Sequence, residues 1–196
     1  MLTFTAAMFF LLITPGPGVL SLAGVGSGFG APAGRRYLWG LFAGNNLVLL
    51  AVTTGLAALV LADPRIRTVL FAASTAYLLY LAARIALAGA RVAFTLRAAP
   101  PGIRGGVLLQ VINPKAYAVN TAVVSGFNFL PERPLWEVTL KALILNALWL
   151  PIHFAWLYAG LSLRRMALSE QTQRRINLAM AAAMLIVVAL AVWAQL

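Results

Sequence analysis

Lys115 is the one charged residue in an apolar stretch that runs from Gly105 to Pro131. It directly follows Asn113-Pro114. If this stretch crosses a membrane, the lysine is roughly 15 Å from either end, further than its stem extends. A charge at that depth costs about 2.5–3.5 kcal/mol, so water, freed carbonyls or an anionic ligand must offset it. Lys115 is therefore a candidate ligand or gating residue. The alternative is a structural lysine bonded to carbonyls that Pro114 leaves unpaired.

A second apolar stretch, from Met1 to Gly34, contains no charged residue and is interrupted by Thr14-Pro15-Gly16-Pro17-Gly18. Proline cannot donate to the helical ladder and clashes with the carbonyl four residues back, so this run predicts the end of a helix. A half-helix that begins near Pro17 would direct free N–H groups and a positive dipole end into the membrane, which suits a carboxylate. The alternative is a kink that only improves packing. The candidate substrate-binding residues at the two breaks are Pro15, Gly16, Pro17, Gly18, Asn113, Pro114 and Lys115.

The composition is that of an integral membrane protein. Of the 196 residues, 62% are hydrophobic, against about 45–50% in soluble domains, and the mean hydropathy is +0.91. The net charge of +11 comes from short basic clusters between apolar runs, which favours a role in membrane topology and argues against nucleic-acid binding. The absence of cysteine from the sequence excludes disulfides, thiolate metal sites and thiol redox chemistry.

The apolar stretches predict an all-α membrane protein with one transmembrane domain over residues 1–196. A spanning helix needs about 20 apolar residues, and the predicted spans are 2–25, 37–61, 68–88, 106–127, 138–161 and 176–193. Six spans divide into two halves of three, which must lie in the membrane with opposite orientation. The first and fourth spans, both broken at proline, then correspond to each other, as in the 3+3 inverted repeats of many secondary transporters. The first span lacks a basic n-region and is interpreted as a retained helix, not a signal peptide.

Basic residues concentrate in the first, third and fifth connections, and such residues accumulate on the cytoplasmic side. Both termini are therefore predicted to lie outside, in a multi-pass protein. The residues on the predicted inner side are Arg35, Arg36, Arg91, Arg97, Arg104, Arg164, Arg165, Arg174 and Arg175, and those on the outer side are Arg65, Arg67 and Arg133.

Polar side chains recur within the spans. Asn46 and Asn146 fall at comparable depths of the second and fifth spans and either bind substrate or hold helices together. His153, the only histidine, follows Pro151 and is a candidate for proton coupling; a hydrogen-bonded structural histidine is the alternative. One histidine and no carboxylate within the spans cannot form a metal site, and neither a Ser/His/Asp constellation nor a cofactor motif is present. We expect no metal, no cofactor and no enzymatic activity.

The chain resembles the LysE/RhtB family of bacterial amino-acid exporters over nearly its whole length. The resemblance is carried by Thr14-Pro15-Gly16-Pro17, by Leu109-Gln110-Val111-Ile112-Asn113-Pro114-Lys115-Ala116 and by Arg174-Arg175-Ile176-Asn177 before the last apolar stretch. It implies a small inner-membrane carrier that exports amino acids or derivatives, driven by the proton gradient. Many relatives have a polar residue where this chain has Gly18, and the missing acidic group argues against a strongly cationic substrate.

The leading hypothesis is a six-helix secondary transporter that exports a small, neutral, zwitterionic amino acid. Its partners would be this substrate and membrane lipid, and a homo-oligomer remains open. The alternatives are an exporter of small ions or metals and a membrane scaffold subunit that transports nothing.

Overall fold

The computed structural model describes residues 1–87, 100–166 and 169–193, and every regular element in these ranges is a helix. The chain thus has the predicted all-α class. The helices are α1 (Leu2–Ile13), α2 (Pro17–Phe29), α3 (Ala31–Thr53), α4 (Leu56–Ala62), α5 (Pro64–Ala86), α7 (Ile103–Ile112), α8 (Pro114–Ser125), α9 (Pro134–Arg165) and α10 (Glu170–Trp193).

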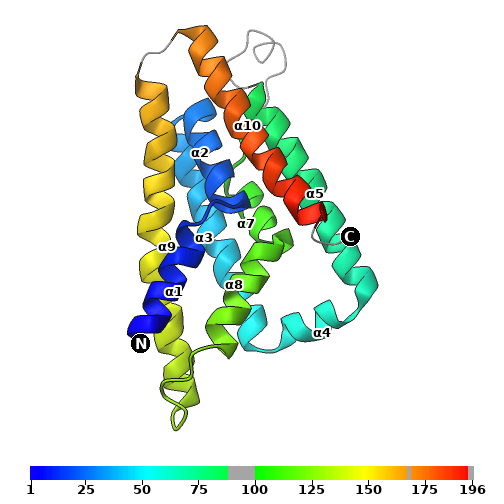
Figure 1. Cartoon of the computed structure of the whole chain (residues 1–196), viewed down its shortest axis with the longest axis vertical. Coiled ribbons are helices and arrows are strands. Elements are labelled where there is room, and N and C mark those ends of the chain that lie inside the picture. The colour runs from blue at the N-terminus through cyan, green and yellow to red at the C-terminus, as the bar shows by residue number, and fades with distance from the viewer. Residues whose placement is uncertain (88–99, 167–168, 194–196) are drawn as a thin grey trace.

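The two halves of the chain run in opposite directions. In Figure 1, α1 and α2 run upward, α3 downward and α5 upward, whereas α7 and α8 run downward, α9 upward and α10 downward. The short α4 lies across the lower end. Opposite chain directions are what two halves of three spans require.

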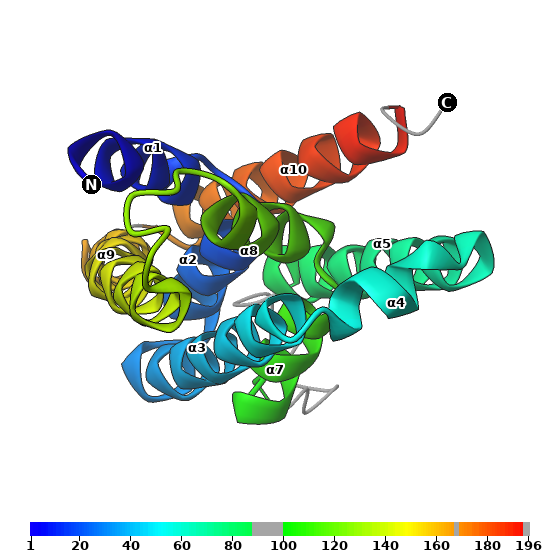
Figure 2. The same ribbon diagram turned by 90° about the horizontal axis from the view of Figure 1, so that it is seen from below.

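The central element is α2. All of its residues from Pro17 to Ser27 are buried, and it packs against α3, α5, α9 and α10. Seen from below, α9 lies on one side of the molecule and the α5–α10 pair on the other (Figure 2). The first residues of α2 are therefore enclosed by protein, which is where a broken helix in a membrane can be tolerated.

Glycines allow backbone contact between helices of the two halves. A Cβ on Gly40 of α3 would overlap the carbonyl of Ile103 in α7, and a Cβ on Gly160 of α9 would overlap the carbonyl of Ala23 in α2. Small residues that bring backbones together are typical of helix packing in membranes, where burial of apolar surface gives little driving force. These contacts hold α7 and α2 against the long helices that flank the two breaks.

Within the described residues, two helices are long and apolar enough to cross a membrane, α5 over Pro64–Ala83 and α9 over its whole length. The helices α1 and α2 form a third span if the bent pair counts as one. At 23 and 24 residues, α3 and α10 also have the length of a span. Polar residues such as Arg35, Arg36, Asn45 and Asn46 lower the hydropathy of α3.

The helix boundaries differ from the predicted spans at the second span. Instead of one helix over 37–61, α3 ends at Thr53, Gly55 adopts φ 75°, and the short α4 follows. Glycine alone takes this left-handed conformation without strain, which ends the helix inside an apolar run. Between α2 and α3 only Gly30, with φ 84°, lies outside the helices, whereas the sequence indicated a longer connection.

Of the arginines of the predicted inner side that the structure describes, those near the beginning of α3 and α10 and at the end of α9 lie towards the upper end of the molecule in Figure 1. Arg104 is in the first turn of α7, which lies nearer the middle of that view. Arg91 and Arg97 lie outside the described residues.

At the lower end, Glu137 and Lys141 form a buried ion pair of 2.7 Å. The Lys141 ammonium also donates to the carbonyls of Val124 (3.2 Å) and Gly126 (2.8 Å) at the end of α8.

Candidate functional site

Both predicted helix breaks are confirmed. The helix α1 ends at Ile13 and α2 begins at Pro17, with a bend of 50° between the two. In the second half, α7 ends at Ile112 and α8 begins at Pro114. Proline occupies the first helical turn of both α2 and α8, where its missing N–H removes no helical hydrogen bond.

The two breaks meet through Lys115. Its ammonium donates a 2.6 Å hydrogen bond to the carbonyl of Thr14, which ends α1. Gly16 leaves room for the lysine stem, because a Cβ there would stand 2.8 Å from Cδ of Lys115. The lysine is thus bonded to a carbonyl freed by the break in the other half of the chain, not by the break at Pro114.

The two half-helices differ at their first turns. The Asn113 side chain caps α8 by accepting a hydrogen bond from the N–H of Lys115 (3.1 Å). The cap position of α2 is Gly16, which has no side chain to do so. Because the first intrahelical bond of α2 runs from Leu20 to Gly16, the N–H groups of Gly18 and Val19 precede the helical ladder. They give α2 a positively polarised, uncapped N-terminus.

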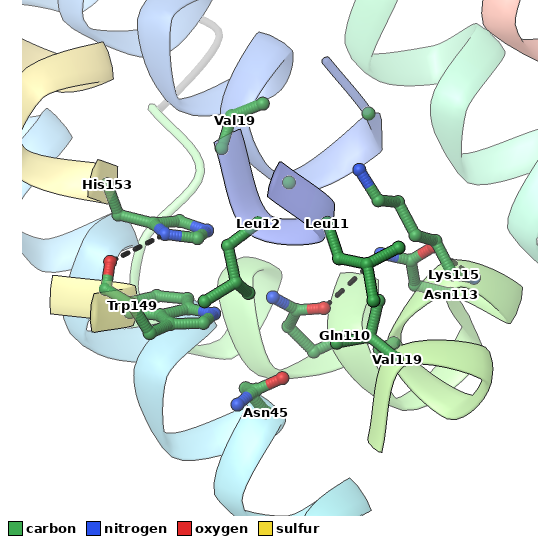
Figure 3. Close-up of a pocket in the computed structure, with 13 residues that line it drawn as sticks. Leu11, Leu12, Val19, Asn45, Gln110, Asn113, Lys115, Val119, Trp149 and His153 are labelled. Atoms are coloured by element: carbon green, nitrogen blue, oxygen red, sulfur yellow. Dashed lines mark hydrogen bonds between the residues drawn. The ribbon is translucent and has the colours of Figure 1, made fainter. Parts of the chain in front are cut away.

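A cavity of about 40 Å³ lies beside this N-terminus. Since a water molecule needs roughly 10–15 Å³ measured in this way, the cavity has room for a few waters only. Figure 3 shows polar side chains from α3, α7, α8 and α9 arranged around the start of α2. The lining residues are Leu11, Leu12, Gly16, Gly18, Val19, Asn45, Gln110, Asn113, Lys115, Ala116, Val119, Trp149 and His153.

His153 is buried and stacked on the indole of Trp149, with ring centroids 3.4 Å apart. Its Nδ1 lies 2.8 Å from the carbonyl of Trp149. Because a carbonyl can only accept, we assign the proton to Nδ1, which leaves Nε2 of the neutral ring as an acceptor. Nε2 lies 3.8 Å from the position of a Cβ on Gly18, so it faces the N-terminus of α2.

Two amide side chains at the site are incompletely bonded. Nδ2 of Asn45 and Oδ1 of Asn120 are buried and have no hydrogen-bond partner among the described residues, although Nδ2 of Asn120 donates to Oδ1 of Asn45 at 3.2 Å. A buried amide group without a partner costs about 1–3 kcal/mol. Asn45 lines the cavity, but its Nδ2 is fully buried in this conformation, so a ligand would reach this donor only once the cavity opens.

The structure brings most of the predicted site residues together. Gly16, Gly18, Asn113, Lys115 and His153 line the cavity. Pro17 and Pro114 begin the two half-helices, and Pro15 lies in the bend between α1 and α2.

Asn46 and Asn146 do not line the cavity. Nδ2 of Asn46 donates to Oδ1 of Asn146 at 3.1 Å, and Nδ2 of Asn146 donates to Oδ1 of Asn46 at 2.9 Å. This reciprocal pair joins α3 to α9.

The sequence did not single out Gln110 or Trp149 as site residues, and of the two adjacent amides in the second predicted span we expected Asn46, not Asn45, to bind substrate. Gln110 lies three residues before Asn113, and Trp149 lies four residues before His153, so each shares a helix face with a residue that had been singled out. Helical spacing could have identified both. Asn45 precedes Asn46, and nothing in the sequence distinguishes which of the two amides faces the cavity.

No group of three or more His, Asp or Glu side chains that could hold a metal ion occurs in the part of the chain that the structure describes.

The family model for the LysE type translocator matches residues 9–195, nearly the whole chain. No curated protein and no solved structure shows significant similarity to the chain.

Proposed function

The chain belongs to the LysE type translocator family, and on that premise we propose that it is a secondary transporter that exports a small, neutral amino acid or derivative across the bacterial inner membrane. The observation that carries the proposal is the cavity where the two helix breaks meet, because its unbonded donors match a carboxylate. The opposite directions of the two halves support alternating access by rocking of one half against the other.

The carboxylate of the substrate binds at the N-terminus of α2. The N–H groups of Gly18 and Val19 lie outside the helical ladder, and a helix N-terminus favours an anion. The free Nδ2 of Asn45 supplies a third donor from α3. Lys115, half-buried at the same cavity, supplies the positive charge that a carboxylate would neutralise.

The ammonium group of the substrate faces two acceptors that belong to residues lining the same cavity. Nε2 of His153 has its lone pair free when Nδ1 carries the proton. Oε1 of Gln110 accepts a hydrogen bond from Asn113, and an amide oxygen has a second lone pair. A site that offers acceptors as well as donors distinguishes a zwitterion from a simple anion.

The side chain of the substrate is neutral. No aspartate or glutamate lines the cavity within the described residues, so a second positive charge would be left without a partner. The apolar part of the lining comes from Leu11, Leu12, Val19 and Val119. A cavity of about 40 Å³ is too small for an amino acid, so this conformation is closed and substrate enters after the halves move apart.

Export is coupled to proton entry through His153. It is the only histidine of the chain, it is buried at the cavity, and its free nitrogen faces the proposed substrate. Protonation there would place a cation beside the substrate ammonium and weaken its binding, which is the exchange that an antiporter needs.

The polar cavity argues against a scaffold subunit, for which the two breaks would only pack against a partner. It also argues against a metal exporter, because its lining offers one imidazole and no carboxylate.

The test is efflux of a panel of labelled amino acids from proteoliposomes that contain the purified protein. We expect efflux of small neutral amino acids, competition by their unlabelled forms, and no competition by the matching amines, which lack the carboxylate. The Lys115→Ala variant should lose this efflux at equal protein levels. Efflux of amines and amino acids alike, or of neither, would refute the proposal.

A further inference from the structure

Most glycines in the transmembrane core are explained by packing. A Cβ on Gly40, Gly106 or Gly160 would overlap the backbone of a neighbouring helix, and a Cβ on Gly24 would overlap the Ile85 side chain. At these positions the fold requires glycine, because a real Cβ never approaches other atoms so closely.

Gly18 has no such explanation. It is buried at the start of α2, yet the nearest atoms to its Cβ position are Nε2 of Gln110 at 3.5 Å and Nε2 of His153 at 3.8 Å. Both distances are ordinary van der Waals contacts. Its φ is not among the positive values of the described glycines, so the backbone does not require glycine either.

Glycine at this helical position carries a cost. Glycine in the middle of a helix is less stable than alanine by roughly 0.5–1 kcal/mol, because it loses more conformational freedom on folding. The same loss of freedom, though not this full value, applies to Gly18 in the first turn of α2. At Gly18 this cost is not offset by a closer approach of helices. What the missing side chain leaves is space inside the cavity, between the polar ends of Gln110 and His153.

The corresponding position of the other half-helix shows what a side chain there does. Pro17-Gly18 begins α2 and Pro114-Lys115 begins α8, each directly after the cap residue. In α8 this second residue carries a long side chain that crosses to Thr14. In α2 the same position is glycine, which has no side chain, so the space beside the uncapped N–H groups stays open.

We propose that Gly18 is the specificity-determining position, and that the Cα and side chain of the substrate lie in the space it leaves between Gln110 and His153. This inference rests on the proposed function. Substituents on residue 18 and on the substrate then compete for the same volume. A larger residue 18 therefore penalises large substrates more than small ones. One methylene group in a fitted pocket changes the rate about tenfold or more.

The experiment compares wild type and Gly18→Ala in proteoliposome efflux of glycine, alanine, valine and leucine. We expect the rate ratio of the smallest to the largest transported substrate to rise at least about tenfold in the variant, and further in Gly18→Val. The matched control is Gly102→Ala, because a Cβ on Gly102 meets no atom of the described residues within 4 Å and Gly102 does not line the cavity. Its ratio should equal that of wild type.

An equal loss for all substrates, or an unchanged ratio in Gly18→Ala, would overturn the inference while leaving the proposed function intact. If wild type exports none of the four, the proposed function fails and the inference fails with it. Gly18→Ser, which adds a similar volume with a different polarity, repeats the test if Gly18→Ala does not fold. For each variant, binding is measured independently as thermal stabilisation of the detergent-solubilised protein by the same amino acids.

Discussion

The Lys115 ammonium donates a 2.6 Å hydrogen bond to the carbonyl of Thr14, so the break in one half of the chain is bonded to the break in the other. The Thr14 carbonyl has no partner within the helix because α1 ends there, so it is free to accept from Lys115. Under the proposed function, a substrate carboxylate that enters the cavity would compete with this carbonyl for the ammonium. The bond is therefore a contact that substrate binding can open, and it links occupancy of the site to the position of α1.

The first prediction concerns this lysine. Lys115→Met keeps most of the stem that packs against Gly16 but removes the charge. A hydrogen bond to a charged group contributes about 1.5–3 kcal/mol, so we expect efflux to fall by at least about tenfold at equal protein abundance. Lys115→Arg, which retains the positive charge, should keep part of the wild-type efflux. If Lys115→Met lowers abundance but not the efflux per molecule, the lysine is structural only.

The amide pair Asn46–Asn146 gives the second prediction. Each side chain donates to the other, so Asn46→Ala removes both bonds of the Asn146 amide to Asn46. In Asn146→Ala, Oδ1 of Asn46 loses its donor while Nδ2 keeps its bond to the Phe42 carbonyl. Polar contacts between membrane helices contribute about 0.6 kcal/mol on average, and we expect a loss of about this size in each single variant. The double variant should lose less than the sum. Thermal unfolding in detergent measures these effects. A rise in the KM for substrate without loss of stability would instead support the predicted role in substrate binding.

The sequence identified the main features of the site because they depend on local chemistry. Proline and glycine end a helix wherever they occur in succession, so both breaks could be located in advance. The need to offset a buried charge identified Lys115, and freed carbonyls were among the expected partners. The contact with Thr14 is an instance of this expectation.

Other features depend on contacts between distant segments, which composition and spacing do not specify. Asn46 and Asn146 are 100 positions apart, and the sequence left open whether they bind each other or a ligand. Glu137 is near a connection in the sequence, yet the turn before α9 folds over it and buries it with Lys141. The single residue between α2 and α3 likewise reflects packing of the two helices, which the glycine-rich sequence did not reveal.

The third prediction concerns the buried pair of Glu137 and Lys141. The three ammonium protons of Lys141 are satisfied by Glu137 and by the carbonyls of Val124 and Gly126. Lys141→Met would leave the Glu137 carboxylate without its ion partner and expose the end of α8, so we expect a clear decrease in melting temperature. Adding Glu137→Gln should restore part of the loss. Substrate preference should not change, because neither residue lines the cavity.

The fourth prediction concerns the backbone contact between α3 and α7. In Gly40→Ala, the new Cβ would overlap the carbonyl of Ile103, and overpacking of this kind costs about 1–3 kcal/mol. We expect a lower yield of folded protein and a lower melting temperature, measured by size-exclusion chromatography and thermal unfolding. Gly102→Ala, in open space at the beginning of α7, is the control. Equal behaviour of the two variants would show that the helices do not approach this closely.

The fifth prediction separates a coupling role of His153 from a structural one. In His153→Asn the side-chain amide can still donate to the Trp149 carbonyl in place of Nδ1, so the fold is expected to persist. The variant lacks both the titratable ring and the free Nε2. We therefore expect the variant to lose efflux driven by an imposed proton gradient. Exchange of labelled for unlabelled substrate across the membrane needs no net proton movement and should continue, with a raised KM because one acceptor for the substrate ammonium is lost.

Wild-type proteoliposomes with a protonophore are the reference for the difference between exchange and gradient-driven efflux. They should also retain exchange and lose gradient-driven efflux. A His153→Asn protein that still accumulates substrate against a gradient would assign proton coupling to another group. A variant that loses both exchange and efflux at normal abundance would assign His153 to substrate binding alone, since a residue that only carries the proton is not needed for exchange.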